Sequence, residues 1–149
     1  VKENGKTLIK RDFSGKPAEV NTGLLSLLMD NGYNPVLCIP IADENGFAIN
    51  SENDDIVTKI AAVTEPECIF QFIEAPGFMD DPADENSLVP TLTGSELAAR
   101  EQQVEGRMKR KMLALCKLFD QGGAKVVISD GRTEHPLLDA INGAGTTIS

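Results

Sequence analysis

The order of apolar and polar residues along the chain predicts strands and helices that alternate. Continuous apolar runs occupy residues 35–40, 68–73 and 126–129, and such runs are typical of strands buried on both faces of a parallel sheet. Apolar residues at helical spacing occupy 21–32, 50–63, 93–102, 106–121 and 136–142. The alternation predicts an α/β fold with helices on both faces of a mainly parallel sheet. Ligands of such sheets bind beyond the carboxyl ends of the strands.

Turn residues mark where these segments begin and end. The dipeptide Asn4-Gly5 predicts a hairpin, and the turn at 43–46 predicts a second reversal of the chain. Asn21 or Thr22 is suited to cap the helix that follows, and Gly32 is suited to end it. The apolar face of that helix is broad, so we expect it to pack against another part of the protein.

Composition and charge narrow the class of protein. The chain has 149 residues, a net charge of -9 and a pI near 4.6, which argues against nucleic-acid binding because phosphate contacts need a surplus of Lys and Arg. No apolar run approaches the roughly 20 residues that span a bilayer. The first residues are polar and resemble no secretory leader, so we expect a cytoplasmic protein. The three cysteines, Cys38, Cys68 and Cys116, lie in apolar segments and are interpreted as reduced core residues.

Two polar clusters are candidates for chemistry. Asn50 and Asp54 are one helical turn apart, so that Asn50 could bind a substrate carboxylate while Asp54 positions a lysine ammonium. The alternative is that this stretch is an ordinary helix N-terminus, whose acidic residues interact favourably with the helix dipole. Spacing alone favours this structural interpretation over a binding role. The basic residues of 107–111 lie at the start of another predicted helix, where an anion such as a nucleotide phosphate would offset their charge. Lys111 is expected to point inward from that cluster, although a solvated basic face explains the same residues.

The loop at 74–79 follows a predicted buried strand, and Gly77 would let a nucleotide approach the backbone closely. An ordinary turn after a strand is the simpler interpretation. The sequence has no Walker-type phosphate loop and no GxGxxG pattern. The acidic residues between 80 and 85 do not have EF-hand spacing, and the single histidine, His135, precedes a proline at a helix start. We interpret the acidic stretch as a solvated loop and His135 as a structural residue.

Several of these stretches occur in an order that resembles the amino acid kinase family. They are RDFSGK at 11–16, NGYNPV at 31–36, AIN at 48–50 with Asp54, EAPGF at 74–78, GRMKRK at 106–111, DGRTEHP at 130–136 and GAGT at 143–146. The resemblance covers essentially the whole chain. It is greatest to the branch that phosphorylates aminoadipate or glutamate bound to an amino-group carrier protein, which is sister to N-acetylglutamate kinase.

The resemblance implies a three-layer αβα sandwich with a mainly parallel central sheet. It implies transfer of the ATP γ-phosphate to a side-chain carboxylate, with Mg²⁺, in lysine or arginine biosynthesis, and a homo-oligomer when the protein is full length. Asn50 matches the substrate-binding residue, Asp54 the residue that orients catalytic lysines, and Lys111 the lysine that stabilises the transition state. The nucleotide-binding positions are matched by Glu74, Ala75, Gly77, Phe78, Met79 and Met108.

The chain also departs from the family pattern. Family members usually carry Asp at the position of Glu74 and a small hydroxyl residue at that of Ile73. They also have an N-terminal half with a second catalytic lysine, a Gly-Gly loop and a substrate-binding arginine, none of which is recognisable here. We therefore expect residues 1–149 to be the nucleotide-binding half, with little turnover on its own. Two alternatives stay open, an N-acetylglutamate or N-acetylaminoadipate kinase and a non-catalytic nucleotide-binding regulatory module.

Overall fold

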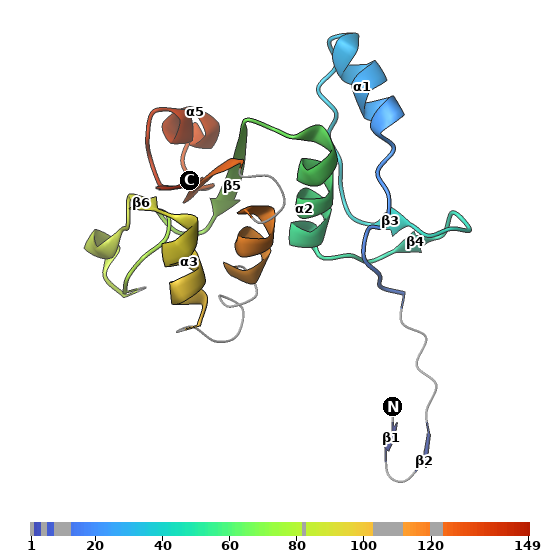
Figure 1. Ribbon diagram of the computed structural model, residues 1–149, viewed down its shortest axis with the longest axis horizontal. Helices are drawn as coiled ribbons and strands as arrows, with labels where there is room; N and C mark the ends of the chain where they lie inside the picture. Colours follow the sequence, from blue (N-terminus) through green and yellow to red (C-terminus); the bar gives the residue numbers. More distant parts are fainter. Residues whose placement is uncertain (1, 4–5, 8–12, 82, 103–111, 120–123) are drawn as a thin grey trace. The chain divides into compact units, whose positions relative to one another are not determined.

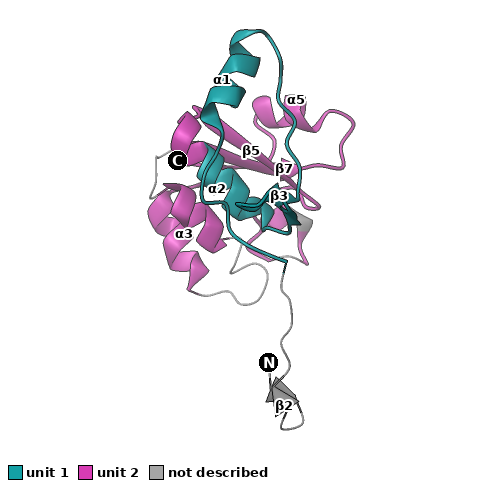
Figure 2. Ribbon diagram, turned by 90° about the vertical axis from the view of Figure 1, so that its right-hand side faces the viewer, with its two compact units in different colours: residues 1–60 teal, residues 61–149 magenta. Residues whose placement is uncertain are grey.

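The computed structural model describes residues 2–3, 6–7, 13–81, 83–102, 112–119 and 124–149. The chain divides into two compact units, residues 1–60 and 61–149, and the division falls within one helix. Figure 2 shows the two units in different colours. Each unit is described by itself below, because their arrangement relative to one another is not determined.

The described residues of the first unit form two small hairpins, one helix and the start of another (Figure 1). Its elements are β1 (Lys2–Glu3), β2 (Lys6–Thr7), α1 (Thr22–Asp30), β3 (Ile41–Ala42), β4 (Ala48–Ile49) and α2 (Asn53–Thr64). Both hairpins are antiparallel, as their turn residues predict. The carboxylate of Asp43 holds the second turn by accepting the backbone N–H groups of Asn45 and Phe47 at 2.9 and 2.8 Å.

Helix α1 has the predicted cap but not the predicted packing. Its N-cap Asn21 accepts the backbone N–H of Leu24 at 2.9 Å, and Gly32 follows the helix with a positive φ of 80°. Leu25 is the one residue of α1 that is buried. The neighbouring Leu24 and Leu27 are 50% and 61% exposed, so the broad apolar face is not covered.

The apolar run at 35–40 is not a buried strand, and this prediction was wrong. These residues belong to no strand, and Val36 is 93% exposed. A run of this kind forms a buried strand only where neighbouring strands and helices supply hydrogen-bond partners and cover. The described part of the first unit supplies neither at this segment.

The second unit contains a four-stranded sheet with the order β5-β7-β8-β6. The strands are β5 (Cys68–Ile73), β6 (Thr91–Leu92), β7 (Lys125–Asp130) and β8 (Thr146–Ile148). The pairs β5–β7 and β6–β8 are parallel, and the central pair β7–β8 is antiparallel. The sheet is therefore mainly parallel, as predicted. The short strand β6 was not predicted, because two residues are too few for a periodic pattern.

Helices cover both faces of this sheet and give an α/β/α arrangement (Figure 1). On one face, Val126 and Ile128 pack against Leu97 of α3 (Gly94–Glu101) and against the helical residues 112–119. The alternate residues of β7 face the other side, where α5 (Pro136–Ile141) contacts β7 and β5. Burial of both faces explains why β7 reads as a continuous apolar run, since its residues 126–129 are all buried. The prediction that 68–73 is buried on both faces was wrong, because β5 is at most half-buried and Phe72 is 43% exposed.

Some details differ from the sequence predictions. The prediction of a core cysteine was wrong for Cys38, which is exposed. Cys68 is half-buried, and the half-buried Cys116 packs against the core cluster. Helix α3 is capped by Thr93 in a capping box with Glu96. Of the long helix predicted at 106–121, the part at 112–119 is confirmed, and the remainder lies outside the described residues.

Gly145 offers a test of how closely β8 is held to β7. A Cβ atom at Gly145 would lie 2.1 Å from the carbonyl oxygen of Ile128, whereas one at Gly143 would meet nothing within 4 Å. Both glycines have similar positive φ angles, 99° and 98°. We predict that Gly143→Ala costs about 1 kcal/mol of unfolding free energy, for backbone strain alone. Gly145→Ala should cost at least about 2 kcal/mol more because of the clash.

Urea denaturation of the two variants and the parent chain measures this difference. Gly143→Ala is the matched control for the strain of a positive φ. Equal losses of stability in the two variants would contradict the close approach of β8 to β7.

Candidate functional site

The backbone around Asn50 is fixed by pairing with the segment at 13–15. The backbone N–H of Asn50 donates to the Phe13 carbonyl at 2.7 Å, and the Gly15 N–H donates to the Asn50 carbonyl at 2.9 Å. Asn50 forms a parallel bridge with Ser14 and lies before the start of α2. Asn50 and Asp54 therefore do not share a helical face, and the spacing argument for such a face was wrong because Asn50 is not helical.

Asn50 nevertheless lines a polar pocket at the start of α2. The pocket has a volume of about 350 Å³ and is lined by Ser14, Gly15, Lys16, Asn50, Ser51, Glu52 and Asp55. Ser51 is 5% exposed, and its hydroxyl oxygen has no hydrogen-bond partner in the structure. A buried hydroxyl without a partner is costly, so Ser51 is a candidate for ligand contact that the sequence analysis missed.

Acidic residues dominate the first turn of α2. Asp54 is half-buried, and its carbonyl accepts the hydroxyl of Thr58 at 2.7 Å. Asp54 does not line the pocket, whereas Glu52 and Asp55 do, and the Asp55 carboxylate lies 3.9 Å from the Lys16 ammonium. The Lys16 side chain is 78% exposed, so this ion pair is strongly solvated and contributes little to stability. The pocket thus contains amide, hydroxyl, carboxylate and ammonium groups, a set that suits a polar ligand.

The loop after β5 is anchored to β8 through a buried threonine. The hydroxyl of Thr146 accepts the Phe78 N–H at 2.8 Å and donates to the Val89 carbonyl at 2.6 Å. Gly77 is buried beside it, and a Cβ atom at Gly77 would lie 2.7 Å from both Leu88 and the Thr146 hydroxyl. Packing inside the unit is therefore sufficient reason for a glycine at this position.

The next two residues of this loop, Phe78 and Met79, also contact other parts of the second unit. Phe78 packs against the core cluster, and the Arg100 guanidinium lies 5.4 Å from the centre of its ring. Arg100 also forms an ion pair with Asp80. Met79 forms an antiparallel bridge with Leu88. Of the predicted nucleotide-binding residues in the loop, Glu74 is exposed, Gly77 is buried, and Ala75, Phe78 and Met79 are half-buried.

A second pocket lies where β5 and β7 end. Because these strands are parallel and in register from Cys68–Lys125 to Ile73–Asp130, their carboxyl ends meet at one edge of the sheet. The pocket has a volume of about 560 Å³ and is lined by Pro76, Leu88, Pro90, Ser129, Asp130, Thr133, Asp139, Asn142, Gly143, Ala144 and Gly145. This is the edge at which α/β sheets bind ligands, and the loop after β5 contributes Pro76 to it.

Asp130, the last residue of β7, is held by a two-pronged interaction with Arg132. The guanidinium donates from Nε to Oδ1 at 2.8 Å and from Nη2 to Oδ2 at 2.7 Å. The backbone N–H of Arg132 adds a third bond to Oδ1 at 2.9 Å. The side-chain hydrogen bonds, followed by the backbone bond, lower the pKa of Asp130 from 3.8 to about 2. A carboxylate therefore lines this pocket at all physiological pH values.

Lys111 and Met108 lie outside the described residues, as does the rest of the basic cluster at 107–111. The predicted pairing of the Lys111 ammonium with Asp54 thus stays a prediction. Within the described ranges, no group of three or more His, Cys, Asp or Glu residues is arranged to hold a metal ion. The described helices are also too short or too polar to cross a membrane.

Comparison with known proteins gives a consistent set of relatives. Residues 3–130 match the amino acid kinase family model. The LysW-aminoadipate kinase of Thermus thermophilus is 35% identical, and the match covers 98% of this chain and 55% of that protein. The LysW-aminoadipate kinase of Deinococcus radiodurans is also 35% identical, and the match covers 99% of this chain and 51% of that protein. Acetylglutamate kinase of Methanothermobacter thermautotrophicus is 31% identical, and the match covers 91% of this chain and 48% of that protein. This chain spans about half the length of these relatives.

Solved structures with low identity share the fold. N-acetylglutamate synthase from Neisseria gonorrhoeae superimposes with a TM-score of 0.82 at 19% identity, over 99% of this chain and 34% of that one. Carbamate kinase from Giardia superimposes with a TM-score of 0.66 at 20% identity, over 91% of this chain and 50% of that one. These matches confirm the predicted α/β fold with a mainly parallel sheet.

The interaction between Asp130 and Arg132 predicts a measurable titration. Replacing Arg132 by Ala removes the two guanidinium hydrogen bonds, so the pKa of Asp130 should rise from about 2 toward 3.8, with the backbone bond retained. Because folding lowers the pKa of Asp130, its ionised carboxylate stabilises the folded state at pH values above the pKa of an unfolded aspartate. That contribution is lost as the pH falls from about 4 to about 2.

The carboxyl carbon of Asp130 can be followed by NMR between pH 2 and 6. Arg100→Ala is the control, because Arg100 pairs with Asp80 and should leave the Asp130 titration unchanged. An Asp130 pKa that is the same in Arg132→Ala and in the parent would contradict the assigned cause.

Proposed function

Since this chain belongs to the amino acid kinase family, we propose that it is the nucleotide-binding half of an ATP-dependent kinase. The reaction transfers the γ-phosphate of ATP to the side-chain carboxylate of aminoadipate or glutamate held on a carrier protein, which gives an acyl phosphate. The choice of a carrier-linked acceptor rests on one observation. The two relatives with 35% identity, from different organisms, are both named LysW-aminoadipate kinase, and each is matched over nearly the whole of this chain.

The roles of the individual residues follow from what this reaction needs. The acceptor carboxylate and the transferred phosphoryl group both carry negative charge, so catalysis depends on positioned donors and cations. We assign Asn50 to the acceptor, Lys111 to the charge that develops on the phosphoryl group, and Asp54 to the orientation of the lysine. The pocket that Asn50 lines offers donors close to Asn50, from Lys16 and the buried Ser51 hydroxyl.

The nucleotide is assigned to the carboxyl edge of β5 and β7. Glu74 and Ala75 follow β5 directly at this edge, where α/β sheets bind their ligands. Gly77, Phe78 and Met79 hold the loop in place through their packing, and Met108 is assigned to the nucleotide on the family resemblance alone. Mg²⁺ would enter with the nucleotide, because it keeps several waters and is usually held by substrate phosphates with one or two carboxylates.

Two alternatives have observations in their favour. Acetylglutamate kinases also match most of the chain, at 31% identity for the Methanothermobacter thermautotrophicus protein. The same fold occurs in a protein named N-acetylglutamate synthase, so the fold by itself does not specify a kinase. A non-catalytic nucleotide-binding module is the second alternative for that reason.

A coupled assay of the whole protein distinguishes these possibilities. The whole protein is this chain together with the half that supplies the rest of a kinase domain, tested with Mg·ATP against carrier-linked aminoadipate, carrier-linked glutamate and N-acetylglutamate. We expect acyl phosphate formation with a carrier-linked acceptor, and little turnover by residues 1–149 alone. Turnover confined to N-acetylglutamate would favour the first alternative. Nucleotide binding without any phosphoryl transfer would favour the second.

Lys111→Ala tests the assigned source of transition-state stabilisation. Removing one positioned donor to a developing negative charge typically costs about 10²–10³-fold in kcat, and we expect at least that loss in the whole protein. Lys109→Ala removes the same charge from a position expected to face water, and should leave kcat within a few-fold of the parent. Equal effects of the two substitutions on kcat would refute the role of Lys111.

A further inference from the structure

The hydroxyl of Ser51 is buried beside the polar pocket at the start of α2 and has no hydrogen-bond partner among the described residues. Ser51 is 5% exposed, so bulk water does not replace the missing partner. Most buried side-chain polar atoms in folded proteins do have a partner. An unpartnered hydroxyl beside a pocket therefore indicates a ligand group that completes its bonding.

The backbone on both sides of Ser51 is held by hydrogen bonds. Before it, Asn50 donates to the Phe13 carbonyl at 2.7 Å and accepts the Gly15 N–H at 2.9 Å. After it, the Glu52 carbonyl accepts a backbone N–H of α2 at 3.2 Å. A shift of the backbone that brought the hydroxyl to another partner would break these bonds. The position of the hydroxyl is consequently set by the fold.

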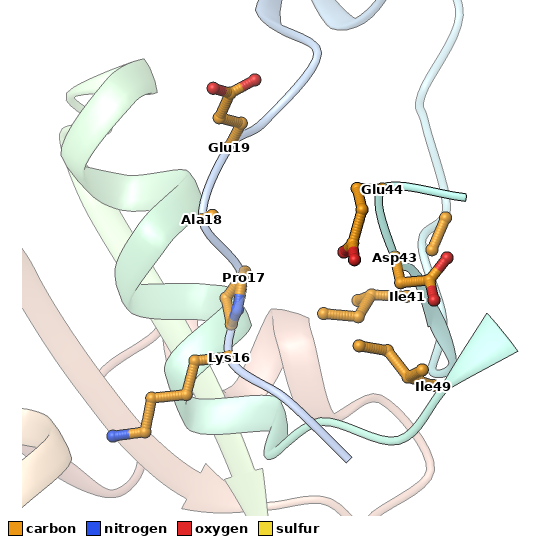
Figure 3. A pocket seen from close by; sticks show the side chains of 9 residues that line it. Lys16, Pro17, Ala18, Glu19, Ile41, Asp43, Glu44 and Ile49 are labelled. Atoms are coloured by element: carbon orange, nitrogen blue, oxygen red, sulfur yellow. The ribbon is translucent and has the colours of Figure 1, made fainter. Parts of the chain in front are cut away.

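Lys16 supplies the positive charge of the same pocket. It also lines a neighbouring groove of about 570 Å³, but Figure 3 shows its side chain directed away from Ile41 and Ile49 of that groove. The ammonium lies instead 3.9 Å from the carboxylate of Asp55, which lines the polar pocket. An ion pair this long, made by a lysine side chain that is 78% exposed, is weak. An incoming anion can therefore compete for the ammonium.

The charges around the pocket specify what kind of anion it accepts. The Ser51 hydroxyl, the Asn50 amide and the Lys16 ammonium are donors, and the first N–H groups of a helix such as α2 have no intrahelical partner. The carboxylates of Glu52 and Asp55 also line the pocket. They repel a multiply charged phosphate more strongly than a singly charged carboxylate. The set of groups thus favours one carboxylate.

We infer that the Ser51 hydroxyl binds the α-carboxylate of the acceptor, together with Asn50 and Lys16. This inference rests on the proposed function, which assigns the acceptor to Asn50. An aminoadipate or glutamate held through its amino group has two carboxylates, of which the side-chain one receives the phosphoryl group. The α-carboxylate stays unmodified and is the one available for permanent recognition. An analogue without it would leave the buried hydroxyl unpaired, which makes Ser51 a specificity-determining residue.

Two acceptor analogues isolate this contact. N-acetyl-L-2-aminoadipate carries both carboxylates, whereas 5-acetamidopentanoate lacks only the α-carboxylate. Isothermal titration calorimetry measures the Kd of each for the whole protein, without ATP. Ser51→Ala should raise the Kd of the first analogue at least about tenfold, because a hydrogen bond to a charged group is lost. It should leave the Kd of the second unchanged.

Matched variants separate this contact from a general loss of structure. Ser51→Thr keeps the hydroxyl and should restore the affinity for N-acetyl-L-2-aminoadipate. Ser26→Ala removes an exposed hydroxyl from α1 and should bind both analogues like the parent. Lys16→Met should, like Ser51→Ala, weaken binding of the first analogue alone. In turnover, Ser51→Ala should raise the KM of the acceptor with kcat unchanged, as expected for uniform binding.

Three results would overturn the inference. They are no saturable binding of N-acetyl-L-2-aminoadipate by the parent, the same Kd in the parent and Ser51→Ala, and an equal loss of affinity for both analogues in Ser51→Ala and Lys16→Met. Failure of the proposed function looks different. A parent that binds the first analogue in a Ser51-dependent way but transfers no phosphoryl group would contradict the kinase reaction and leave this contact intact.

Discussion

The parallel pairing of β5 with β7 is the constraint on which the described architecture of the second unit depends. Their register brings Ile73 and Asp130 to the same edge of the sheet. It also aligns Val126 and Ile128 beneath Leu97 of α3, which closes one face of the core. The loops that leave these two strands consequently start at neighbouring positions. Proximity of loops distant in the sequence is the usual reason that α/β sheets bind ligands at this edge.

The loop after β5 illustrates how packing and candidate function share the same residues. Gly77, Phe78 and Met79 are used by the fold, through Thr146, the core cluster and Leu88 respectively. Glu74 and Ala75 precede this anchored part. A ligand at the strand ends would therefore meet a short stretch whose position is set by its neighbours, which lowers the conformational entropy lost on binding.

The sequence predicted those parts of the structure whose cause is local. The Asn21 cap and the Asp43 turn each depend on residues within four positions of one another. The buried run at 126–129 was also predictable, because burial on both faces removes the polar alternation. The run at 35–40 shows the limit of that reasoning, since the same composition forms a strand only when other segments pair with it and cover it.

The candidate sites were less predictable, because they depend on contacts between distant residues. Asn50 was identified, but its bridge to Ser14 depends on a segment 36 residues away in the chain, and spacing alone placed it on a helix. Ser51 carries no pattern that distinguishes it from other serines, and its significance comes from burial without a partner. The packing role of Gly77 required knowledge of Thr146, which lies near the end of the chain.

The central claim is that this chain carries a nucleotide site at the carboxyl edge of β5 and β7. Titrating the ¹⁵N-labelled chain with Mg·ATP and following its amide resonances tests that claim most directly. The account predicts saturable shifts that cluster at 74–75 and at 130–133, with the resonances of α1 unchanged. Absence of saturable shifts, or shifts confined to residues 13–60, would contradict it.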